Sequence, residues 1–315
     1  MSPPRPLSVV LIGAGAMAHN HARVLSSLPS TRLDLIVDTD GERAAKLAAE
    51  AGCGSACELG PGAWDAAIIA TPPQTHAELA VEVLSRGIPV LVEKPMAVDL
   101  TDVHLILGAA ARLRIPLTCG FVERFNPVVS AALSVLDEPP VHIVGMRHSP
   151  PSLRAATSSV VHDLLIHDID LAMVLNPGRA LQRACGSTWT APTGVVEIAD
   201  ALLSFEGSML ATLSASRAGQ RKVRHMSVMT TSKLIELDLL RQDLTVYQHI
   251  DFPWGDTGPD YRTRTVIDIP FVRHTGEPLA LEIEHFVALA RGELDMEAER
   301  STLLAPHVAA ASVAA

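Results

Sequence analysis

The sequence predicts an α/β protein in which a doubly wound parallel sheet is followed by a second α/β domain with a large, mostly antiparallel open sheet. Up to about residue 120, short apolar strands alternate with helices. Beyond that point, longer strand candidates follow one another with few helices between them. Because domains commonly span roughly 100–200 residues, the 315 residues can hold two domains, which we place at residues 1–120 and 121–315.

In the first domain, each predicted strand is a continuous apolar run and a helix follows all but the last. Continuous apolar strands are typical of a sheet that is covered on both faces, and helical crossovers make neighbouring strands parallel. The predicted strands are Leu7–Ile12, Leu33–Val37, Ala66–Ala70, Pro89–Val92 and Pro116–Cys119. The predicted helices are Met17–Leu28, Glu42–Ala51, Gln74–Arg86 and Leu100–Arg112.

The second domain is rich in strands. Glu206-Gly207 lies between two strand candidates and is a hairpin signal. Because few crossover helices separate the strands, we expect largely antiparallel pairing. The expected strands are His142–Arg147, Leu181–Thr190, Glu197–Phe205, Ser208–Arg217, Val223–Met229, Lys233–Leu239, Asp243–Tyr247 and Thr263–Ile269. The expected helices are Pro127–Val135, Val160–Leu175 and Leu279–Arg291.

Composition argues against several classes of partner. A formal net charge of −10 and an aromatic content of 3% disfavour nucleic-acid binding. No uninterrupted apolar run reaches the ~18 residues of a membrane span, and the first residues lack the apolar core of a secretory signal. We therefore expect no membrane partner and a cytoplasmic location. The four cysteines lack the paired spacing of a zinc site, so we expect reduced thiols and no metal.

A glycine-rich turn follows the first predicted strand and opens a helix. Gly13–Ala18 matches the pattern G-x-G-x-x-G/A in the context that is typical of Rossmann domains. Gly13 permits the tight turn and Gly15 lets the backbone approach a pyrophosphate. The backbone N–H groups of Ala16 and Met17 at the helix start would bind phosphate oxygens. The turn predicts a dinucleotide site.

Asp38 ends the second predicted strand. A carboxylate there can accept hydrogen bonds from the adenosine ribose hydroxyls and would repel a 2′-phosphate. Thr39 and Asp40 follow it, and no arginine comes immediately after. The sequence therefore favours NAD over NADP as the cofactor.

Ligands of an open parallel sheet lie outside the carboxyl ends of its strands, so the residues that follow the strands are candidates for the site. The candidates for contact with the cofactor are Thr71, Pro72, His76, Glu93, Lys94 and Arg124. Lys94 is one of only four lysines, and its ammonium group could hold a substrate hydroxyl and stabilise negative charge on oxygen. The alternative for Lys94 is a simple ion pair with Glu93.

The second domain contains an aspartate and a histidine at the spacing of one helical turn. Asp163 and His167 are four residues apart, hence neighbours on one helix face. A carboxylate beside an imidazole can fix its tautomer and raise its basicity, which suits a general base acting on an alcohol, and Asp170 could assist. A metal site is disfavoured because His162 and His167 point apart. The alternative is a structural polar network.

Together, these motifs resemble those of the Gfo/Idh/MocA family of NAD(P)-dependent sugar oxidoreductases. The resemblance rests on Gly13–Ala18, Asp38, Ala70–His76, Val92–Pro95 and Asp163–Asp170. It implies a Rossmann domain followed by an α/β domain that binds substrate. The open sheet of that second domain would form the interface of a homodimer or homotetramer. It also implies that the family's catalytic lysine, aspartate and histidine are Lys94, Asp163 and His167.

A narrower resemblance links Glu123–Pro127, His167–Asp170 and Glu277–Leu279 to the branch with nucleotide-sugar 3-dehydrogenases, among them those that act on UDP-N-acetylglucosamine. It implies oxidation of the C3 hydroxyl of a nucleotide sugar to a ketone. The expected substrate contacts are Lys94, Arg124, Asn126, Arg154, Asp163 and His167. The cations that could bind a diphosphate are Arg124, Arg147, Arg154, Arg221 and Arg224.

We therefore predict an NAD-dependent dehydrogenase for a secondary hydroxyl of a sugar or nucleotide sugar, in which His167 takes the hydroxyl proton. One alternative is the same chemistry on an inositol, a free sugar or an aminoglycoside ring, and the negative net charge would attract the last of these. Another alternative is a regulator that senses the dinucleotide without turnover.

Overall fold

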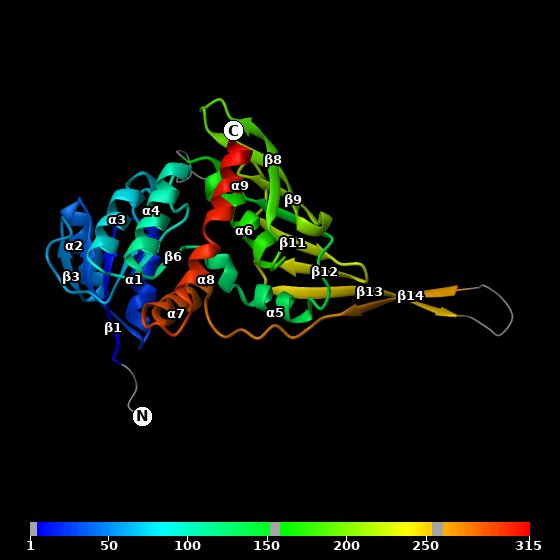
Figure 1. Ribbon diagram of the computed structural model, residues 1–315, viewed down its shortest axis with the longest axis horizontal. Helices are drawn as coiled ribbons and strands as arrows, with labels where there is room; N and C mark the ends of the chain where they lie inside the picture. The colour runs from blue at the N-terminus through cyan, green and yellow to red at the C-terminus, as the bar shows by residue number, and fades with distance from the viewer. Residues whose placement is uncertain (1–4, 152–157, 254–260) are drawn as a thin grey trace. The chain divides into compact units, whose positions relative to one another are not determined.

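A parallel sheet of six strands lies at the centre of the amino-terminal part of the chain (Figure 1). Its strand order is β3-β2-β1-β4-β5-β6, and all neighbouring strands run parallel. The order reverses between β1 and β4, so the carboxyl ends of these two strands mark the edge at which such sheets bind ligands. The strands are β1 (Leu7–Ile12), β2 (Thr31–Val37), β3 (Gly54–Ala56), β4 (Ala66–Ile69), β5 (Val90–Val92) and β6 (Leu117–Cys119).

Helices cover both faces of this sheet. On one face, α1, α2 and α7 enclose an apolar core with β1, β2 and β4, in which Leu25, Ile36, Ile68 and Phe286 are buried. The helices α3 and α4 pack against each other beside β4 and β5. The helices are α1 (Ala16–Ser27), α2 (Gly41–Ala51), α3 (His76–Ser85), α4 (Leu100–Leu113), α7 (Pro278–Ala290) and α8 (Met296–Ser301).

Local capping fixes where two of these helices begin and end. Asp40 accepts a hydrogen bond from the backbone N–H of Arg43 at the start of α2, and Asp99 does the same for Asp102 at the start of α4. Gly52 ends α2 in the left-handed conformation, with φ +73°, which glycine adopts without a steric penalty.

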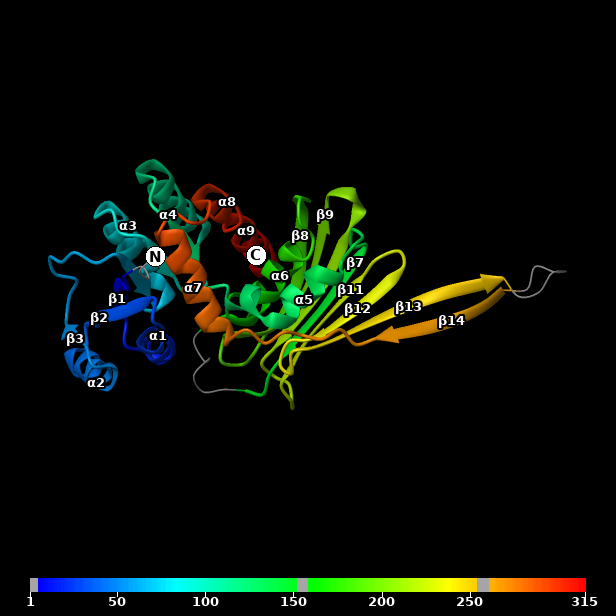
Figure 2. The same ribbon diagram turned by 90° about the horizontal axis from the view of Figure 1, so that it is seen from below.

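An eight-stranded sheet dominates the rest of the chain (Figure 2). Its order is β14-β13-β12-β11-β7-β10-β9-β8, and only the β7–β10 pair is parallel among the pairs of neighbouring strands that the structure describes. β13 and β14 run past the ends of the neighbouring strands (Figures 1 and 2). The strands are β7 (His142–His148), β8 (Leu181–Thr190), β9 (Val196–Phe205), β10 (Leu210–Ser216), β11 (Val223–Met229), β12 (Lys233–Asp238), β13 (Asp243–Pro253) and β14 (Tyr261–Asp268).

The two faces of this sheet differ in character. Along β7, Ile143, Gly145 and Arg147 are buried on the face that α5 (Pro127–Val135) and α6 (Ile166–Val174) cover. The alternate residues point to the other face, which we call the open face. Its exposed large apolar side chains are Val144, Met146, Trp189, Leu202, Leu210 and Met229.

The computed structural model describes residues 5–151, 158–253 and 261–315, and the chain divides into two compact units. The first comprises Met1–Val122 and Gly276–Val308, and the second comprises Glu123–Thr275 and Ala309–Ala315. From the sequence, we assigned everything after residue 120 to the second domain. The structure differs, because α7 buries its apolar face in the core of the first unit.

Several elements differ from the sequence predictions. The short strand β3 and the helices α8 and α9 (Leu304–Ala314) were not predicted. The helix expected over Val160–Leu175 starts with a π-helical turn, η4 (Val161–Leu165), before α6. The hairpin expected at Glu206-Gly207 joins the antiparallel strands β9 and β10.

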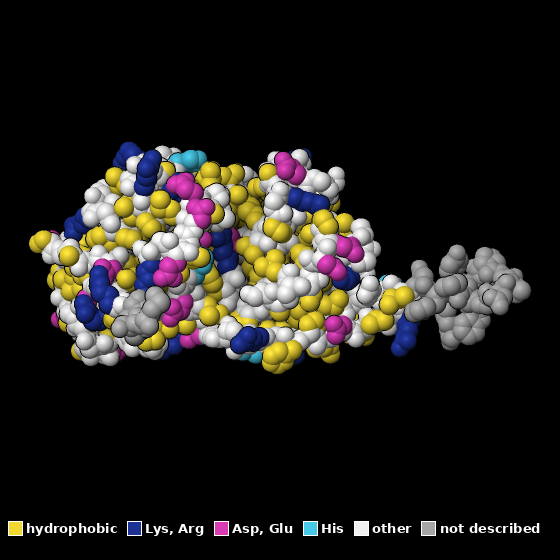
Figure 3. Space-filling model, turned by 60° about the horizontal axis from the view of Figure 1, so that its bottom comes forward, with side chains coloured by type: hydrophobic (Ala, Val, Ile, Leu, Met, Phe, Trp, Pro, Cys, Tyr) yellow, Lys and Arg dark blue, Asp and Glu magenta, His cyan; other side chains and the backbone are white. Residues whose placement is uncertain are grey.

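On the face drawn in Figure 3, Lys and Arg side chains are interspersed with Asp and Glu side chains, so neither positive nor negative charge gathers in one patch. Among the described residues, none of the helices is long and apolar enough to cross a bilayer.

Candidate active site

The glycine-rich turn after β1 leaves its backbone open. Gly13 has φ +110°, and a Cβ there would lie 2.5 Å from the carbonyl oxygen of Ala70, so only glycine fits this position. A Cβ on Gly15 would meet no atom within 4 Å. A side chain at position 15 would therefore not collide with the described residues around it, apart from its neighbours in the chain.

The start of α1 is suited to an anion. Its first turn contains no acidic residue, and no side chain caps it. Ala16 and Met17 are exposed at this end. Backbone N–H groups in the first turn of a helix have no partner within the helix, and they carry its positive dipole end. This geometry fits the pyrophosphate of a dinucleotide.

Asp38 follows β2 and connects it to the glycine-rich turn. Its Oδ2 accepts a hydrogen bond from the backbone N–H of Ala14 at 2.7 Å, and its Oδ1 accepts one from the N–H of Asp40 at 2.9 Å. The guanidinium of Arg43 also donates to Oδ1, at 3.0 Å. Although no arginine follows Asp38 immediately in sequence, the first turn of α2 brings one against it. The carboxylate, the glycines and the α1 start together fit NAD, which these residues would hold.

Lys94 is half-buried on the turn that follows β5. The preceding side chain, Glu93, is buried, and its Oε1 accepts a hydrogen bond from His21 Nε2 at 2.7 Å. Its Oε2 accepts one from the backbone N–H of Lys94 at 3.2 Å. Burial acts to raise the pKa of Glu93, but the hydrogen bond and charge of His21, together with the charge and backbone N–H of Lys94, hold that pKa below its ordinary value. Glu93 thus fixes the backbone that presents Lys94.

Two more buried histidines hold the same turn. The ring nitrogens of His76 lie 3.1 Å from the carbonyl oxygen of Pro95 and 2.9 Å from that of Thr71. His307 Nε2 accepts a hydrogen bond from the backbone N–H of Met96 at 3.0 Å. We therefore assign His76 to positioning the turn and not to contact with the cofactor.

Thr71 and Pro72, which follow β4, are half-buried and exposed, respectively. The Thr71 hydroxyl accepts a hydrogen bond from Thr75 Oγ1 at 2.8 Å. Both residues lie at the carboxyl edge of the parallel sheet, as expected for neighbours of a cofactor.

The predicted catalytic residues of the second unit lie in the helical segment η4–α6. Asp163 belongs to the π-helical turn, and His167 is buried near the start of α6. Arg217, directly after β10, donates to Asp163 Oδ2 at 3.3 Å and to Glu197 Oε2 at 2.8 Å. It also donates to the backbone oxygen of Val196 at 3.2 Å. Arg217 is buried, so it holds Asp163 in a fixed position.

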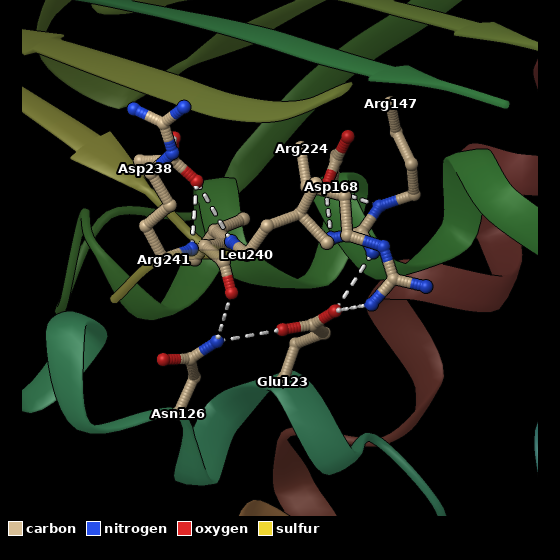
Figure 4. Close-up of polar contacts among 9 residues, drawn as sticks. Glu123, Asn126, Arg147, Asp168, Arg224, Asp238, Leu240 and Arg241 are labelled. Atoms are coloured by element: carbon tan, nitrogen blue, oxygen red, sulfur yellow. Dashed lines mark hydrogen bonds and ion pairs between the residues drawn. The ribbon is translucent and has the colours of Figure 1, made fainter. Parts of the chain in front are cut away.

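A network of buried charges lies beside this segment (Figure 4). Arg147 donates through Nη1 to Glu123 Oε1 at 2.8 Å and through Nη2 to Asp168 Oδ1 at 2.7 Å. Arg224 Nη1 donates to the same oxygen of Glu123 at 3.0 Å. Burial raises the pKa of Asp168 despite the opposing charge of Arg147. For Glu123, the charges of Arg147 and Arg224 outweigh burial and lower the pKa.

The amino-terminal unit matches a known family. The sequence profile of the oxidoreductase family with an NAD-binding Rossmann fold, Gfo/Idh/MocA, matches residues 7–121. Residues 7–121 are therefore a Gfo/Idh/MocA-type NAD-binding domain. The matched segment contains the glycine-rich turn, Asp38 and Lys94 described above.

Relatives of this oxidoreductase extend the match beyond the first unit. The UDP-N-acetylglucosamine 3-dehydrogenase of Acidithiobacillus ferrooxidans is 27% identical over 286 residues, which cover 88% of this chain and 86% of that enzyme. A solved structure of the same enzyme, GnnA, superposes with a TM-score of 0.82 and 25% identity over 98% of each chain. The myo-inositol dehydrogenase Hyg17 of Streptomyces leeuwenhoekii is 29% identical over 67% of this chain and 70% of that protein. Levoglucosan dehydrogenase, solved with NADH, shares the fold with a TM-score of 0.79 and 20% identity, over 98% of this chain and 96–98% of the solved chains.

Two of the predicted substrate contacts take part in internal networks. Arg124 binds the carboxylate of Asp170, with Nε 2.8 Å from Oδ2. Asn126 is buried, donates to Glu123 Oε2 at 3.1 Å and caps α5. We therefore exclude Asn126 from the proposed site.

The arginines predicted to bind a diphosphate differ in how exposed their side chains are. Arg147 is buried between two carboxylates and is not available to a ligand. Arg224 is partly exposed, Arg221 is exposed, and Arg154 lies outside the described residues.

Three residues that contact the predicted site residues, or the turn that carries one of them, were not singled out from the sequence. His21 and His307 contact the Lys94 turn from α1 and α9, and Arg217 contacts Asp163 from the end of β10. His21 falls on the buried face of α1 with Ala18, Ala22 and Leu25. A histidine within an apolar helix face was the one signal available for it.

Proposed function

We propose that this oxidoreductase oxidises a secondary hydroxyl of a sugar to a ketone, and that the substrate is a nucleotide sugar oxidised at C3. The proposal is supported by the similarity to a UDP-N-acetylglucosamine 3-dehydrogenase along 88% of the chain. The amino-terminal unit supplies a site that fits NAD.

The proposed reaction assigns one role to each of three side chains. NAD, when bound, accepts the hydride from the carbon that carries the hydroxyl. His167 removes the hydroxyl proton, and Asp163 orients the imidazole and stabilises its protonated form. Lys94 donates a hydrogen bond to the substrate oxygen and stabilises its developing negative charge.

The observation that carries the proposal is the construction of the Lys94 turn. The turn lies at the carboxyl edge of the parallel sheet, where ligands of this fold bind. His76 and His307 bind its backbone, and His21 binds the side chain of Glu93. Such support is expected where an ammonium group must be presented at a fixed place, because a loosely held catalytic group loses much of its effect.

A second candidate is the oxidation of an inositol ring, which the similarity to the myo-inositol dehydrogenase Hyg17 favours. The chemistry and the three residues would be the same. An inositol carries no diphosphate, so this candidate requires no cation site for the substrate.

The test is NADH formation by the purified protein with NAD and a panel of UDP- and dTDP-sugars, free sugars, inositols and aminoglycosides. A single-turnover format would detect activity even if NADH leaves slowly. We expect a signal with nucleotide sugars that disappears in Lys94→Ala and His167→Ala while NAD binding is retained. Full activity in both variants would contradict the assignment of Lys94 and His167. Absence of turnover across the panel with intact NAD binding would favour a dinucleotide sensor.

We also propose that two or four copies assemble through the open face of the eight-stranded sheet. The exposed Val144, Met146 and Leu202 lie on neighbouring parts of that face, and such apolar patches commonly mark interfaces. Light scattering should give a mass of two or four times 33.5 kDa. Met146→Glu should reduce it to one copy, whereas Leu105→Glu on α4 should leave it unchanged. A monomeric wild type would contradict the proposal.

A further inference from the structure

We propose that Arg224 and Lys222 form a subsite for an oxyanion carried by the substrate, either a phosphate ester or a carboxylate on the sugar. The inference rests on the proposed function, because it names the class of substrate that the same site takes. It selects two cations of the second unit, one of which, Lys222, was not among the predicted ligands.

Both side chains lie on one face of the sheet. Residues two apart in a strand point to the same side, so Lys222, just before β11, shares a face with Arg224. Further along β11, that face carries the buried Met226 and Val228. Arg224 is also the register partner of Arg147 on β7. The covered face of the sheet therefore gathers three cations at this end of β11.

One cation of this cluster is not paired with a carboxylate of the described residues. Arg147 forms ion pairs with Glu123 and Asp168, and Arg224 forms one with Glu123. One oxygen of Glu123 is shared by the two arginines, and its other oxygen accepts from Asn126. Asp163, whose charge also acts on Arg224, is paired with Arg217. Among the described residues, Lys222 forms no ion pair and therefore lacks a carboxylate partner, and a bound anion could pair with it.

Arg224 is the arginine that can reach a ligand. Its side chain is 32% exposed, whereas that of Arg147 is 2% exposed. Arg224 uses Nη1 for Glu123, and its other donors have no hydrogen-bond partner among the described residues. Lys222 is exposed and forms no ion pair with the described part of the chain. The guanidinium of Arg224 and the ammonium group of Lys222 can therefore both donate hydrogen bonds to an oxyanion.

The electrostatics of the two cations favour the binding of an anion. Burial lowers the pKa of Arg224, and the charge of Arg147 lowers it further. The charge of Arg224 is the main cause that lowers the pKa of Lys222. An oxyanion between them would relieve this repulsion.

The subsite is linked to the predicted catalytic segment. The charges of Asp163 and Asp168 both act on Arg224, and both residues belong to the η4–α6 segment. An anion held at Arg224 would therefore bind beside the segment that carries His167. Arg124 and Arg217 are less suited, because each is bound to carboxylates of its own unit.

The experiment measures binding of UDP, inorganic pyrophosphate and glucuronate by calorimetry to the NAD-loaded protein. Arg224→Gln and Lys222→Gln are compared with Arg241→Gln, which removes an exposed arginine whose side chain lies 3.9 Å from Asp238 (Figure 4). Thermal melting checks that each variant folds, and Lys222→Gln leaves the contacts of Glu123 intact. The same variants are assayed for turnover with a UDP-sugar and with the corresponding free sugar.

We expect the Kd for the preferred anion to rise about tenfold or more in the Arg224 and Lys222 variants. The Arg241 variant should stay within about twofold of the wild type, in the range of a surface substitution. Stronger binding of UDP and pyrophosphate than of glucuronate would identify a phosphate ester, and the reverse would identify a carboxylate. An unchanged Kd in both folded variants, or no binding of any of the three anions, would overturn the subsite. Because binding is measured without turnover, failure of the proposed dehydrogenase activity would not be mistaken for failure of the subsite.

Discussion

Asp38 accepts a hydrogen bond from the backbone N–H of Ala14, with 2.7 Å between N and Oδ2. This contact ties the end of β2 to the glycine-rich turn after β1. The same carboxylate is the predicted ligand of the adenosine ribose. One side chain therefore both shapes the dinucleotide site and presents an acceptor to it.

Replacing Asp38 with alanine should weaken NAD binding. Loss of a charge-assisted hydrogen bond costs about 1.5–3 kcal/mol, so we expect the Kd for NAD to rise roughly tenfold or more, measured by calorimetry. Asp40→Ala is the matched control, because it removes the cap of α2 and leaves Asp38 in place. If NAD affinity falls equally in both variants, the role of Asp38 is not specific.

The two glycines of the turn should respond differently to alanine. In Gly13→Ala, the new Cβ would collide with the carbonyl of Ala70, so we expect a lower melting temperature as well as weaker NAD binding. In Gly15→Ala, the methyl group meets no protein atom, so the melting temperature should hold while NAD binding weakens. A stable Gly15→Ala protein with unchanged NAD affinity would mean that the pyrophosphate does not approach Gly15.

His307 should matter for both stability and activity. Its Nε2 accepts the N–H of Met96, and its Nδ1 lies 2.7 Å from the carbonyl oxygen of Leu303. In His307→Phe the ring beside Phe121 is kept but the buried N–H of Met96 loses its acceptor, which costs about 1–3 kcal/mol. We expect a lower free energy of unfolding in urea and slower turnover. His307→Gln can supply an acceptor and should restore part of both losses, whereas equal defects in the two variants would contradict this explanation.

The pattern of apolar runs predicted the first unit well because β1, β4 and β5 at the centre of its sheet are buried along their whole length. β1 coincides with the predicted range Leu7–Ile12. The signal fails for β3, which has three residues and an exposed start, and for α9, whose alanine-rich sequence reads as a tail. Buried apolar strands were therefore predicted from the sequence, whereas a short exposed strand and an alanine-rich helix were missed.

Partners far apart in sequence could not be predicted. The sequence does not indicate that the carboxylate of Glu93 binds His21, which lies 72 residues earlier. Arg147 reads as a surface cation because most arginines are exposed. Only the crossing of β7, η2 (Val122–Phe125) and α6 places Glu123 and Asp168 around it and makes it structural.

Acid should destabilise the protein partly through His76. Burial lowers the pKa of His76 below its ordinary value of 6.5. As the pH falls below 6.5, the unfolded chain gains this proton before the folded chain does, so the folded state loses stability. The stability contribution of neutral His76 is therefore complete above pH 6.5 and is lost towards the lower pKa of the folded state.

The check is the free energy of unfolding in urea at several pH values from 8 downwards. His76→Gln should show a shallower loss below pH 6.5 than the wild type. His104→Gln, at an exposed position on α4, should keep the wild-type slope. An unchanged slope in His76→Gln would show that other groups cause the acid sensitivity.

The first unit is assembled from both ends of the chain, since Met1–Val122 packs with Gly276–Val308. On the ribosome, its six strands emerge first, but the face of its sheet that α1 and α2 cover stays incompletely covered until α7 has been synthesised. His307, which holds the Lys94 turn, emerges later still. The second unit is thus synthesised almost entirely before the first is complete, and an interrupted translation product would expose to chaperones and proteases the part of the apolar core that α7 covers.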